Sequence, residues 1–429
     1  MPSASVALGR HPLLLPAANL TLRAAGLAMR FGLVIYLARY LGIGAVGQFG
    51  LIQGAAALAP VVLGWGVTYF LGREIVGRPP LQAGRLVRDR LLLTIASLTA
   101  AGAIVAALMV AGGIAVPDSL PWIATILFLE TIAFDLHLAL ISLGRPLAAN
   151  WLLFIRSGLW VLPAAGLGIA FPGLRSLDFV LLCWTLALVA NFGTLLSVAR
   201  DWPLAAISRH RVDTAWILAR LRGSGLIYLN DLGIAGMAYL DRYVVHSRLD
   251  LHATGIFVLH WAIANAIHVL VTAATIQVSL PVLVTAYRTG GERKWRRELR
   301  DLSVRVAAIG APLAILVYAV AVHALPPATR TALPIDAPLL ALMLASTVIR
   351  LLADALNYGL YSRGLDRSLA WINIGGALAA LLFSLMLLPR FGLLGGGLAM
   401  VLASTLLLAA RAAALAGRDR ASPMEPRHG

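Results

Sequence analysis

The sequence is poor in charged residues, poorest in acidic ones, and contains a single cysteine. Charged residues make up only 13% of its 429 residues, about half the share of an ordinary soluble domain. Hydrophobic residues make up 60%, and the mean hydropathy is +0.86. This balance excludes a soluble enzyme, a disordered chain and a disulfide scaffold, and the surplus of apolar residues must therefore face lipid.

The sequence also lacks the usual signatures of catalytic and metal chemistry. Cys183 lies in an apolar run and has no second cysteine to pair with. The nine histidines show no metal-ligand spacing, and no phosphate-binding loop of the Walker A type is present. We therefore expect no catalytic residue, no metal site and no built-in ATPase, and the chain is predicted not to be an enzyme.

Long apolar runs predict an integral membrane protein made only of helices. A bilayer crossing takes about 20 apolar residues. Twelve such spans are expected near residues 20–41, 46–72, 91–116, 120–143, 150–170, 177–199, 224–245, 254–286, 304–323, 337–361, 369–388 and 393–415. The predicted organisation is a cytoplasmic leader, a six-helix bundle, a basic cytoplasmic linker, a second six-helix bundle and a cytoplasmic tail, at residues 1–19, 20–199, 200–223, 224–415 and 416–429.

Basic residues predict how the chain is oriented. The formal net charge is +16, and Lys294 is the only lysine among 35 basic residues. Twenty-four of the 35 fall in the termini and loops on the side of the N-terminus, and four fall in the opposite loops. Because cytoplasmic loops collect Lys and Arg, both termini are predicted to be cytoplasmic, and we expect no nucleic acid partner. The basic segments around 200–223 and 287–303 are expected to lie on anionic lipid headgroups, with docking of a partner protein as the alternative.

A short repeat relates the two predicted bundles. Residues 36–40 read Tyr-Leu-Ala-Arg-Tyr, and residues 239–243, six spans later, read Tyr-Leu-Asp-Arg-Tyr. A Gly-x-aromatic sequence follows each copy, at 47–49 and 255–257. Two parallel halves with a central cleft explain the repeat, and chance similarity between Leu- and Ala-rich helices is the alternative.

Ionisable and polar residues inside the spans mark the candidate site. Each membrane-buried charge costs about 2.5–3.5 kcal/mol on insertion scales, so such residues face a cavity or a partner. Polar stripes at helical spacing run along several spans, which favours a hydrated cavity over salt bridges that only hold the bundle. Arginine suits phosphate and carboxylate groups, so an anionic substrate is expected. The candidate substrate-binding residues are Arg23, Arg30, Arg156, Arg350, Asn265, His268 and Asn357.

Three segments resemble the polysaccharide flippases, the O-antigen or Wzx-type family of the MOP/MATE superfamily. Residues 30–73 resemble the opening of that family, residues 239–258 its seventh span and the following turn, and residues 388–400 its last junction between two spans. Each motif is loose, but their order and spacing agree with twelve spans in two halves.

The resemblance implies a protein of the bacterial inner membrane that flips an undecaprenyl-pyrophosphate-linked oligosaccharide for surface polysaccharide biosynthesis. Arg23 and Arg30 stand at positions where the family uses cavity arginines. Asp231 and Asp354 match acids on the seventh and tenth spans that bind a coupling cation in relatives, and Glu130 is a third candidate. The implied partners are the lipid-linked oligosaccharide, membrane lipids and the polysaccharide polymerase machinery, and a coupling proton or Na⁺ is the only cofactor expected.

Two other functions remain open at the level of sequence. A cation-coupled multidrug antiporter of the same superfamily would be expected to have a mainly acidic and aromatic cavity. A membrane polysaccharide polymerase or glycosyltransferase would need a sizeable outside loop, and the longest such loop predicted here, about 324–336, is short.

Overall fold

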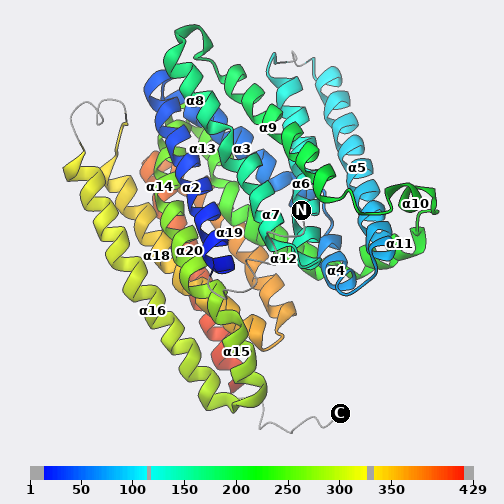
Figure 1. Ribbon diagram of the computed structural model, residues 1–429. Helices are drawn as coiled ribbons and strands as arrows, with labels where there is room; N and C mark the ends of the chain where they lie inside the picture. The colour runs from blue at the N-terminus through cyan, green and yellow to red at the C-terminus, as the bar shows by residue number, and fades with distance from the viewer. Residues whose placement is uncertain (1–13, 114–116, 326–332, 420–429) are drawn as a thin grey trace. The chain divides into compact units, whose positions relative to one another are not determined.

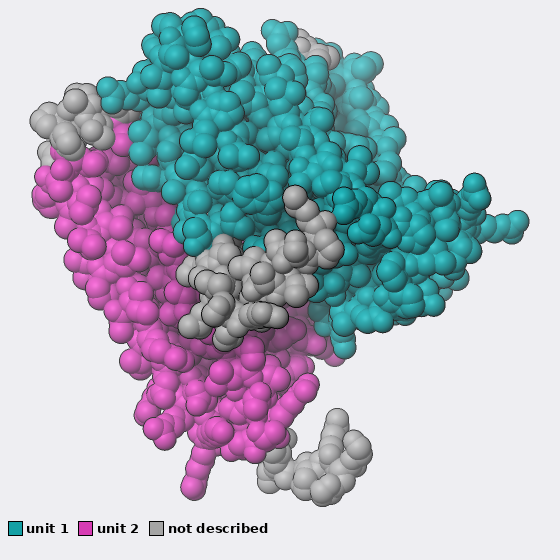
Figure 2. Space-filling view, viewed as in Figure 1, with its two compact units in different colours: residues 1–228 teal, residues 229–429 magenta. Residues whose placement is uncertain are grey.

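The computed structural model describes residues 14–113, 117–325 and 333–419, leaving out the side chains of residues 14–20, 23, 418 and 419. Every regular element in these residues is a helix, as Figure 1 shows. The chain divides into two compact units, residues 1–228 and 229–429, coloured separately in Figure 2. Predicted spans one to six fall in the first unit, and the other six fall in the second apart from the first turn of the seventh span. The predicted all-helical membrane fold is confirmed.

The described part of the N-terminal unit contains six long helical spans, one of them formed by α7 and α8 together, and several short helices. Its α-helices are α2 (Leu14–Tyr40), α3 (Ile43–Val62), α4 (Val67–Glu74), α5 (Pro80–Ala111), α6 (Leu120–Ser142), α7 (Pro146–Phe154), α8 (Val161–Ala170), α9 (Leu177–Val198), α10 (Leu204–Arg209) and α11 (Thr214–Gly223). A π-helical turn, Ile155–Leu159, joins α7 to α8, and a 3₁₀ turn, Pro172–Leu174, follows α8.

The second predicted span is divided, because α3 ends where the chain turns sharply. Trp65 and Gly66 both have positive φ angles, 53° and 68°, which the right-handed helix does not allow. Glycine adopts this geometry without steric cost, whereas tryptophan does so rarely. The turn allows α4 to leave the direction of α3 and to pack against α5 and α6.

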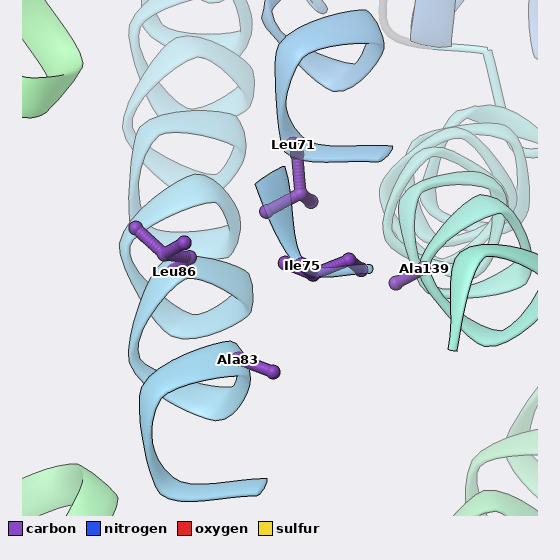
Figure 3. Close-up of a cluster of buried hydrophobic side chains, with 5 residues drawn as sticks. All are labelled: Leu71, Ile75, Ala83, Leu86 and Ala139. Atoms are coloured by element: carbon purple, nitrogen blue, oxygen red, sulfur yellow. The ribbon is translucent and has the colours of Figure 1, made fainter. Parts of the chain in front are cut away.

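Small apolar clusters fix the short helix α4. Figure 3 shows Leu71 and Ile75, at the end of α4, beside Ala83 and Leu86 of α5 and Ala139 of α6. All five are buried, Ile75 and Ala83 completely. Farther along α5, by contrast, most side chains of its apolar half are exposed. We interpret that half of α5 as a lipid-facing surface, because a soluble protein would bury it.

The C-terminal unit is built mainly from long helices. They are α12 (Gly225–Tyr239), α13 (Asp241–Arg248), α14 (Leu251–Val271), α15 (Gln277–Thr289), α16 (Gly291–Ala319), α18 (Ala337–Ser362), α19 (Asp366–Phe391) and α20 (Leu393–Asp419). π-Helical turns at Thr272–Ile276 and Val320–Ala324 interrupt the eighth and ninth spans. The seventh span is divided at Leu240, between α12 and α13. Helix α18 is central, since it contacts α14, α15, α16, α19 and α20.

Ten helical segments of the described chain are long and apolar enough to cross a membrane. The first and seventh predicted spans are not among them. Helix α2 carries Arg23, Arg30 and Arg39, which lower its hydropathy, and the seventh span is divided into helices of 15 and 8 residues. Both spans form helices where the sequence predicts them, so the ten segments agree with a bundle of about twelve helices.

The two basic segments that the sequence places in loops are largely helical. Residues 200–223 contain α10 and α11, which lie in the first unit. There Glu74 accepts a hydrogen bond from Trp216 Nε1 (2.7 Å) and forms an ion pair with Arg220, whose Nε lies 2.8 Å from Glu74 Oε1. The second segment, near 287–303, is the end of α15 and the beginning of α16, separated at Gly290. Helix α16 therefore begins 13 residues before the predicted start of the ninth span, residue 304.

Several bounds fall beside the predicted ones or outside the described residues. Helix α2 begins at Leu14, within the segment predicted as a leader, and α20 continues to Asp419, within the predicted tail. The ends of both termini, residues 114–116 of the predicted third span and most of the outside loop near 324–336 lie outside the described residues.

Candidate functional site

A small polar cavity lies within the C-terminal unit. Its volume is about 40 Å³, enough for a few water molecules, since one water needs about 10–15 Å³. The cavity is too small for a sugar ring, so any larger substrate needs the lining helices to separate. The polar or aromatic side chains that line it come from α13, α14, α18 and α20 and are Asp241, Trp261, Asn265, His268, Ser346, Thr347, Arg350 and Ser404.

Arg350 is the guanidinium that lines this cavity. It is partly exposed, and no hydrogen bond or ion pair joins it to another residue within the part of the chain that the structure describes. It interacts electrostatically with Asp241 and Asp354 without pairing directly with either. A guanidinium that faces a cavity without a carboxylate partner is suited to bind an anionic group.

Two further cavity residues, Asp241 and Trp261, are held by their neighbours. Asp241 is buried and accepts a hydrogen bond from Ser384 Oγ of α19 (3.3 Å). Arg242 lies over the Trp261 ring, with its guanidinium carbon 4.4 Å from the ring centroid, and 4.9 Å from the centroid of Tyr239. The predicted repeat therefore places its arginine in an aromatic setting here, and Arg39 of the first copy lies 5.7 Å from the centroid of Tyr40.

Asp354 of α18 lies at the centre of the strongest polar contacts beside the cavity. Its Oδ1 accepts from Arg411 Nη1 of α20 at 2.9 Å, and its Oδ2 lies 2.8 Å from His268 Nε2 of α14. Asp354 is 23% exposed, whereas Arg411 is only 2% exposed. The structure thus brings the predicted residues His268 and Asp354 together and adds an arginine that was not predicted.

A chain of amide side chains continues from Arg411 to the other acid predicted for ion coupling. Arg411 Nη2 donates to Asn373 Oδ1 (2.8 Å), and Asn373 Nδ2 donates to Asn230 Oδ1 (2.7 Å). Asn230 Nδ2 then donates to Asp231 Oδ1 (3.1 Å). Asp231 and Asp354 are therefore joined through a continuous series of hydrogen bonds across α12, α19, α20 and α18.

The remaining polar candidates of this unit lie on the same helices. Asn265 lines the cavity one turn before His268. Asn357 follows Asp354 by one turn on α18, and its Oδ1 is buried with no hydrogen-bond donor among the described residues. Thr272, one turn after His268, has a buried Oγ1 that likewise has no hydrogen-bond partner among the described residues. The polar stripes predicted on the eighth and tenth spans therefore meet at the His268–Asp354 contact.

In the N-terminal unit, two predicted residues pair with each other. Arg156 Nη1 of the π-helical turn donates to Glu130 Oε2 of α6, and Trp184 Nε1 donates to Glu130 Oε1 at 3.0 Å. Arg156 and Glu130 are each 8% exposed. Trp160 stacks on Trp184 with ring centroids 5.6 Å apart. Arg156 was predicted to bind substrate and Glu130 to bind an ion, and the structure places both in one buried ion pair.

Of the two arginines predicted to bind substrate on the first span, Arg30 is the one whose side chain the structure describes. Arg30 is exposed, and its Nε donates to the backbone carbonyl of Ser157 (3.1 Å). The side chain of Arg23 lies outside the described residues, although its backbone belongs to α2. A separate buried pair, Arg90 Nη2 with Asp135 Oδ1 (3.0 Å), joins α5 to α6 and is supported by Thr94.

Sequence reasoning missed Arg411, Asn373 and Asn230 as members of the site. Arg411 was the detectable one, because an arginine inside the twelfth span requires a partner or a cavity. The two asparagines gave no comparable signal, since a single amide in an apolar helix has many structural uses. Within the described residues, no group of three or more His, Cys, Asp and Glu side chains is arranged to hold a metal ion.

Comparisons with known proteins identify the fold. No protein-family model and no curated protein matches the chain. A solved inward-facing structure of a multidrug resistance MATE family transporter of the MOP superfamily matches with a TM-score of 0.68 and 16% identity, covering 91% of this chain and 93% of the other. An outward-facing structure of a transporter with the same description matches with a TM-score of 0.60 and 15% identity over 94% and 95% of the two chains.

A third solved structure differs from the first two in its description, which says that the reverse polarity of that transporter's binding pocket suggests a different function. It is a MOP superfamily transporter from Pyrococcus furiosus, and it matches with a TM-score of 0.58 and 14% identity over 95% of each chain. At these identities the comparison establishes a shared fold, which is that of MATE transporters of the MOP superfamily.

Proposed function

We propose that the chain is a multi-pass membrane transporter that moves a polyprenyl-diphosphate-linked oligosaccharide across the bacterial inner membrane by alternating access. The observation that carries this proposal is Arg350, a cavity guanidinium with no carboxylate partner among the described residues. Diphosphate is the anionic group that such a lipid carries, and arginine binds it through paired hydrogen bonds. The shared fold with MOP superfamily transporters supports transport as the general activity.

The other cavity side chains suit the sugar part of this substrate. Trp261 offers an aromatic face, and Asn265, Ser346 and Thr347 offer amide and hydroxyl groups. Sugars present both apolar ring faces and hydroxyl groups, which bind aromatic and polar side chains respectively. A substrate that binds Arg350 together with these aromatic, amide and hydroxyl side chains would carry an anionic group and a polar group at the same end. Its polyprenyl chain would remain in lipid.

Arg30, exposed on the first span, keeps its predicted role as a substrate ligand of the N-terminal unit. Arg23 lies seven residues earlier on the same helix and keeps its predicted role as an expectation. Arg156 has a weaker claim, because its guanidinium is already paired with buried Glu130. Its release would leave a buried carboxylate unpaired, which is strongly unfavourable.

A strain lacking the gene tests this function. We expect the lipid-linked oligosaccharide to accumulate on the cytoplasmic leaflet and a surface polysaccharide to disappear, and the wild-type gene to restore both. Arg350→Gln and Arg30→Ala, at normal abundance, should transport at least about tenfold more slowly, since a hydrogen bond to a charged group contributes about 1.5–3 kcal/mol. Arg305→Gln is the matched control, because Arg305 is exposed on α16 and does not line the cavity.

The second candidate function is a cation-coupled multidrug antiporter. Asp241 in the cavity and the multidrug transporters of the same fold favour it. Under this function the deletion strain would become sensitive to cationic drugs, lipid-linked oligosaccharide would not accumulate, and Asp241→Asn would be more damaging than Arg350→Gln. That combination of results would refute the flippase proposal.

A further inference from the structure

Asp354 is the natural place to look for a coupling cation, because it is an acidic residue of a predicted membrane span and contacts His268, which lines the cavity. Both of its carboxylate oxygens are already engaged. Oδ1 accepts from Arg411 at 2.9 Å, and Oδ2 lies 2.8 Å from His268 Nε2. A metal cation at Asp354 would have to displace one of these groups or sit close to a permanent positive charge.

Arg411 is held in place and cannot easily move away. Its side chain is 2% exposed, and its second terminal nitrogen, Nη2, donates to Asn373 Oδ1 at 2.8 Å. Asn373 has no exposed surface and is itself fixed by its hydrogen bond to Asn230. A planar guanidinium bound on two sides is pre-organised, so it loses little further entropy in pairing with the carboxylate.

We infer that Arg411 is the built-in counter-ion of Asp354, that no Na⁺ site exists at this carboxylate, and that a proton on His268 is the exchangeable cation there. The electrostatic reason is direct. Two unit charges of the same sign about 4 Å apart repel by several kcal/mol at the effective dielectric of a protein. A sodium ion beside Asp354 would meet this repulsion and would also have to displace Arg411 or His268 from the carboxylate. A proton on His268 displaces neither group and strengthens an existing hydrogen bond, which offsets the same repulsion.

His268 lies among charged and titratable groups from several helices. Asp354, Arg350 and Tyr358 come from α18, Arg411 from α20 and Asp241 from α13. With His268 neutral, Asp354 and Asp241 balance Arg411 and Arg350. With His268 protonated, the group carries one net positive charge. A single proton therefore changes the charge of the cavity by one unit.

This charge change gives the proton a role in transport, and that role rests on the function proposed above. An anionic headgroup at Arg350 would bind more tightly when His268 carries its proton. The ion pair between Asp354 and Arg411 forms without any substrate. The inference can therefore be tested on purified protein without any substrate.

The first test measures whether sodium stabilises the purified, full-length protein. Its Tm is measured while Na⁺ replaces N-methyl-D-glucamine at constant ionic strength, because an ion that binds the folded state raises Tm. We expect the wild-type Tm not to change. A sodium-dependent rise that Asp354→Asn abolishes would overturn the inference.

The second test exposes the carboxylate. Arg411→Ala leaves Asp354 without its counter-ion, so this variant should lose stability and regain several degrees of Tm with Na⁺ or guanidinium ion in the buffer. Arg305→Ala is the matched control, because it removes an exposed arginine of α16 and leaves the Asp354–Arg411 pair intact, and it should gain no cation dependence. Adding Asp354→Asn to Arg411→Ala should remove the gain. If Arg411→Ala gains no more cation dependence than Arg305→Ala, Arg411 is not the counter-ion.

Should Arg411→Ala fail to fold, the sodium dependence of the wild-type Tm and the variant Arg411→Lys still decide the question. Lysine keeps the positive charge, so the Tm of this variant should remain insensitive to Na⁺.

The role of the proton is tested by transport in proteoliposomes between about pH 5 and 8, where histidine titrates. We expect the wild-type rate to depend on pH and His268→Gln to lose that dependence. A His268→Gln rate that keeps the wild-type pH profile would remove His268 from the coupling. Failure of oligosaccharide transport with an unchanged Tm result would reject the proposed function alone.

Discussion

At the scale of single residues, the membrane arginines of this chain differ in what their guanidinium groups are bound to. Arg156 is paired with buried Glu130, and Arg411 with Asp354. Arg242 is buried over the ring of Trp261. Arg350 alone among these four has no direct partner in the described residues, although it lines the cavity. We therefore propose that arginine serves stability where its guanidinium is paired and substrate binding at Arg350.

The Glu130–Arg156 pair is expected to act in stability. Arg156→Met leaves the Glu130 carboxylate buried, with the Trp184 indole N–H still donating to it. Removing one partner of a buried ion pair costs about 3–5 kcal/mol, so the variant should unfold at clearly lower denaturant. The double variant Glu130→Gln with Arg156→Met should recover most of this loss, because no unpaired charge remains.

Arg200→Met is the control for this comparison, since the Arg200–Asp201 pair is exposed and its nitrogen and oxygen are 3.6 Å apart. Exposed pairs contribute about 0–1 kcal/mol, so Arg200→Met should change the free energy of unfolding only slightly.

Transport per folded molecule should be near normal in the double variant Glu130→Gln with Arg156→Met. A stable double variant that cannot transport would show instead that the pair acts on the substrate.

At the scale of helices, close approach between α12 and α19 positions the amide chain that reaches Arg411. A Cβ atom on Gly233 would lie 2.4 Å from the carbonyl carbon of Asn373 and 2.6 Å from its oxygen. These are backbone atoms, so rotation of a side chain cannot relieve the contact. Glycine at this position therefore allows Asn230 of α12 to reach Asn373 of α19.

Gly233→Ala should force α12 away from α19 and break the Asn230–Asn373 hydrogen bond. We expect a loss of about 1–3 kcal/mol, the usual cost of overpacking, measured by thermal or denaturant unfolding. Gly375→Ala on α19 is the matched control, because nothing lies within 4 Å of its added Cβ. That substitution should be neutral or stabilising by about 0.5–1 kcal/mol, since alanine favours the helix. Equal stability of the two variants would contradict the close approach.

At the scale of the whole molecule, the distribution of arginine predicts the orientation in the membrane. Basic residues gather in the segments on the side of both termini, including α10, α11 and the beginning of α16. Arg248, at the end of α13, is one of the four on the opposite side. Charge asymmetry of this size sets topology during insertion, because Lys- and Arg-rich segments remain in the cytoplasm.

Cysteine labelling tests this orientation, and the chain is suited to it because its one cysteine, Cys183, is buried. In a Cys183→Ala background, Arg248→Cys should react with a membrane-impermeant maleimide in intact spheroplasts. Arg209→Cys, at the end of α10, should react only after the membrane is opened. Both residues are exposed in the structure, so access to the reagent depends on the side of the membrane. The reverse pattern would contradict cytoplasmic termini.

The sequence by itself determined the membrane class, the helical spans and the faces that carry polar residues. Apolar run length and helical periodicity are local properties, so they can be read along one helix at a time. The stripes with His268 and Asp354 were found in this way, and the structure joins them at 2.8 Å. The break at Leu240 is not predicted, because composition continues smoothly through it. The early start of α16 is not predicted either, because its first turns are densely charged and lie outside the apolar run that marks the span.

Only the tertiary structure decided which charges meet. Arg411 belongs to α20, Asp354 to α18 and His268 to α14, and nothing in their spacing along the chain pairs them. The same holds for Arg156, which was expected to face a substrate and lies against Glu130 of another helix. Periodicity assigns each residue to a face of its helix, but the partner on that face comes from how the helices pack. Packing is therefore what separates the paired Arg156 and Arg411 from Arg350, which remains available in the cavity.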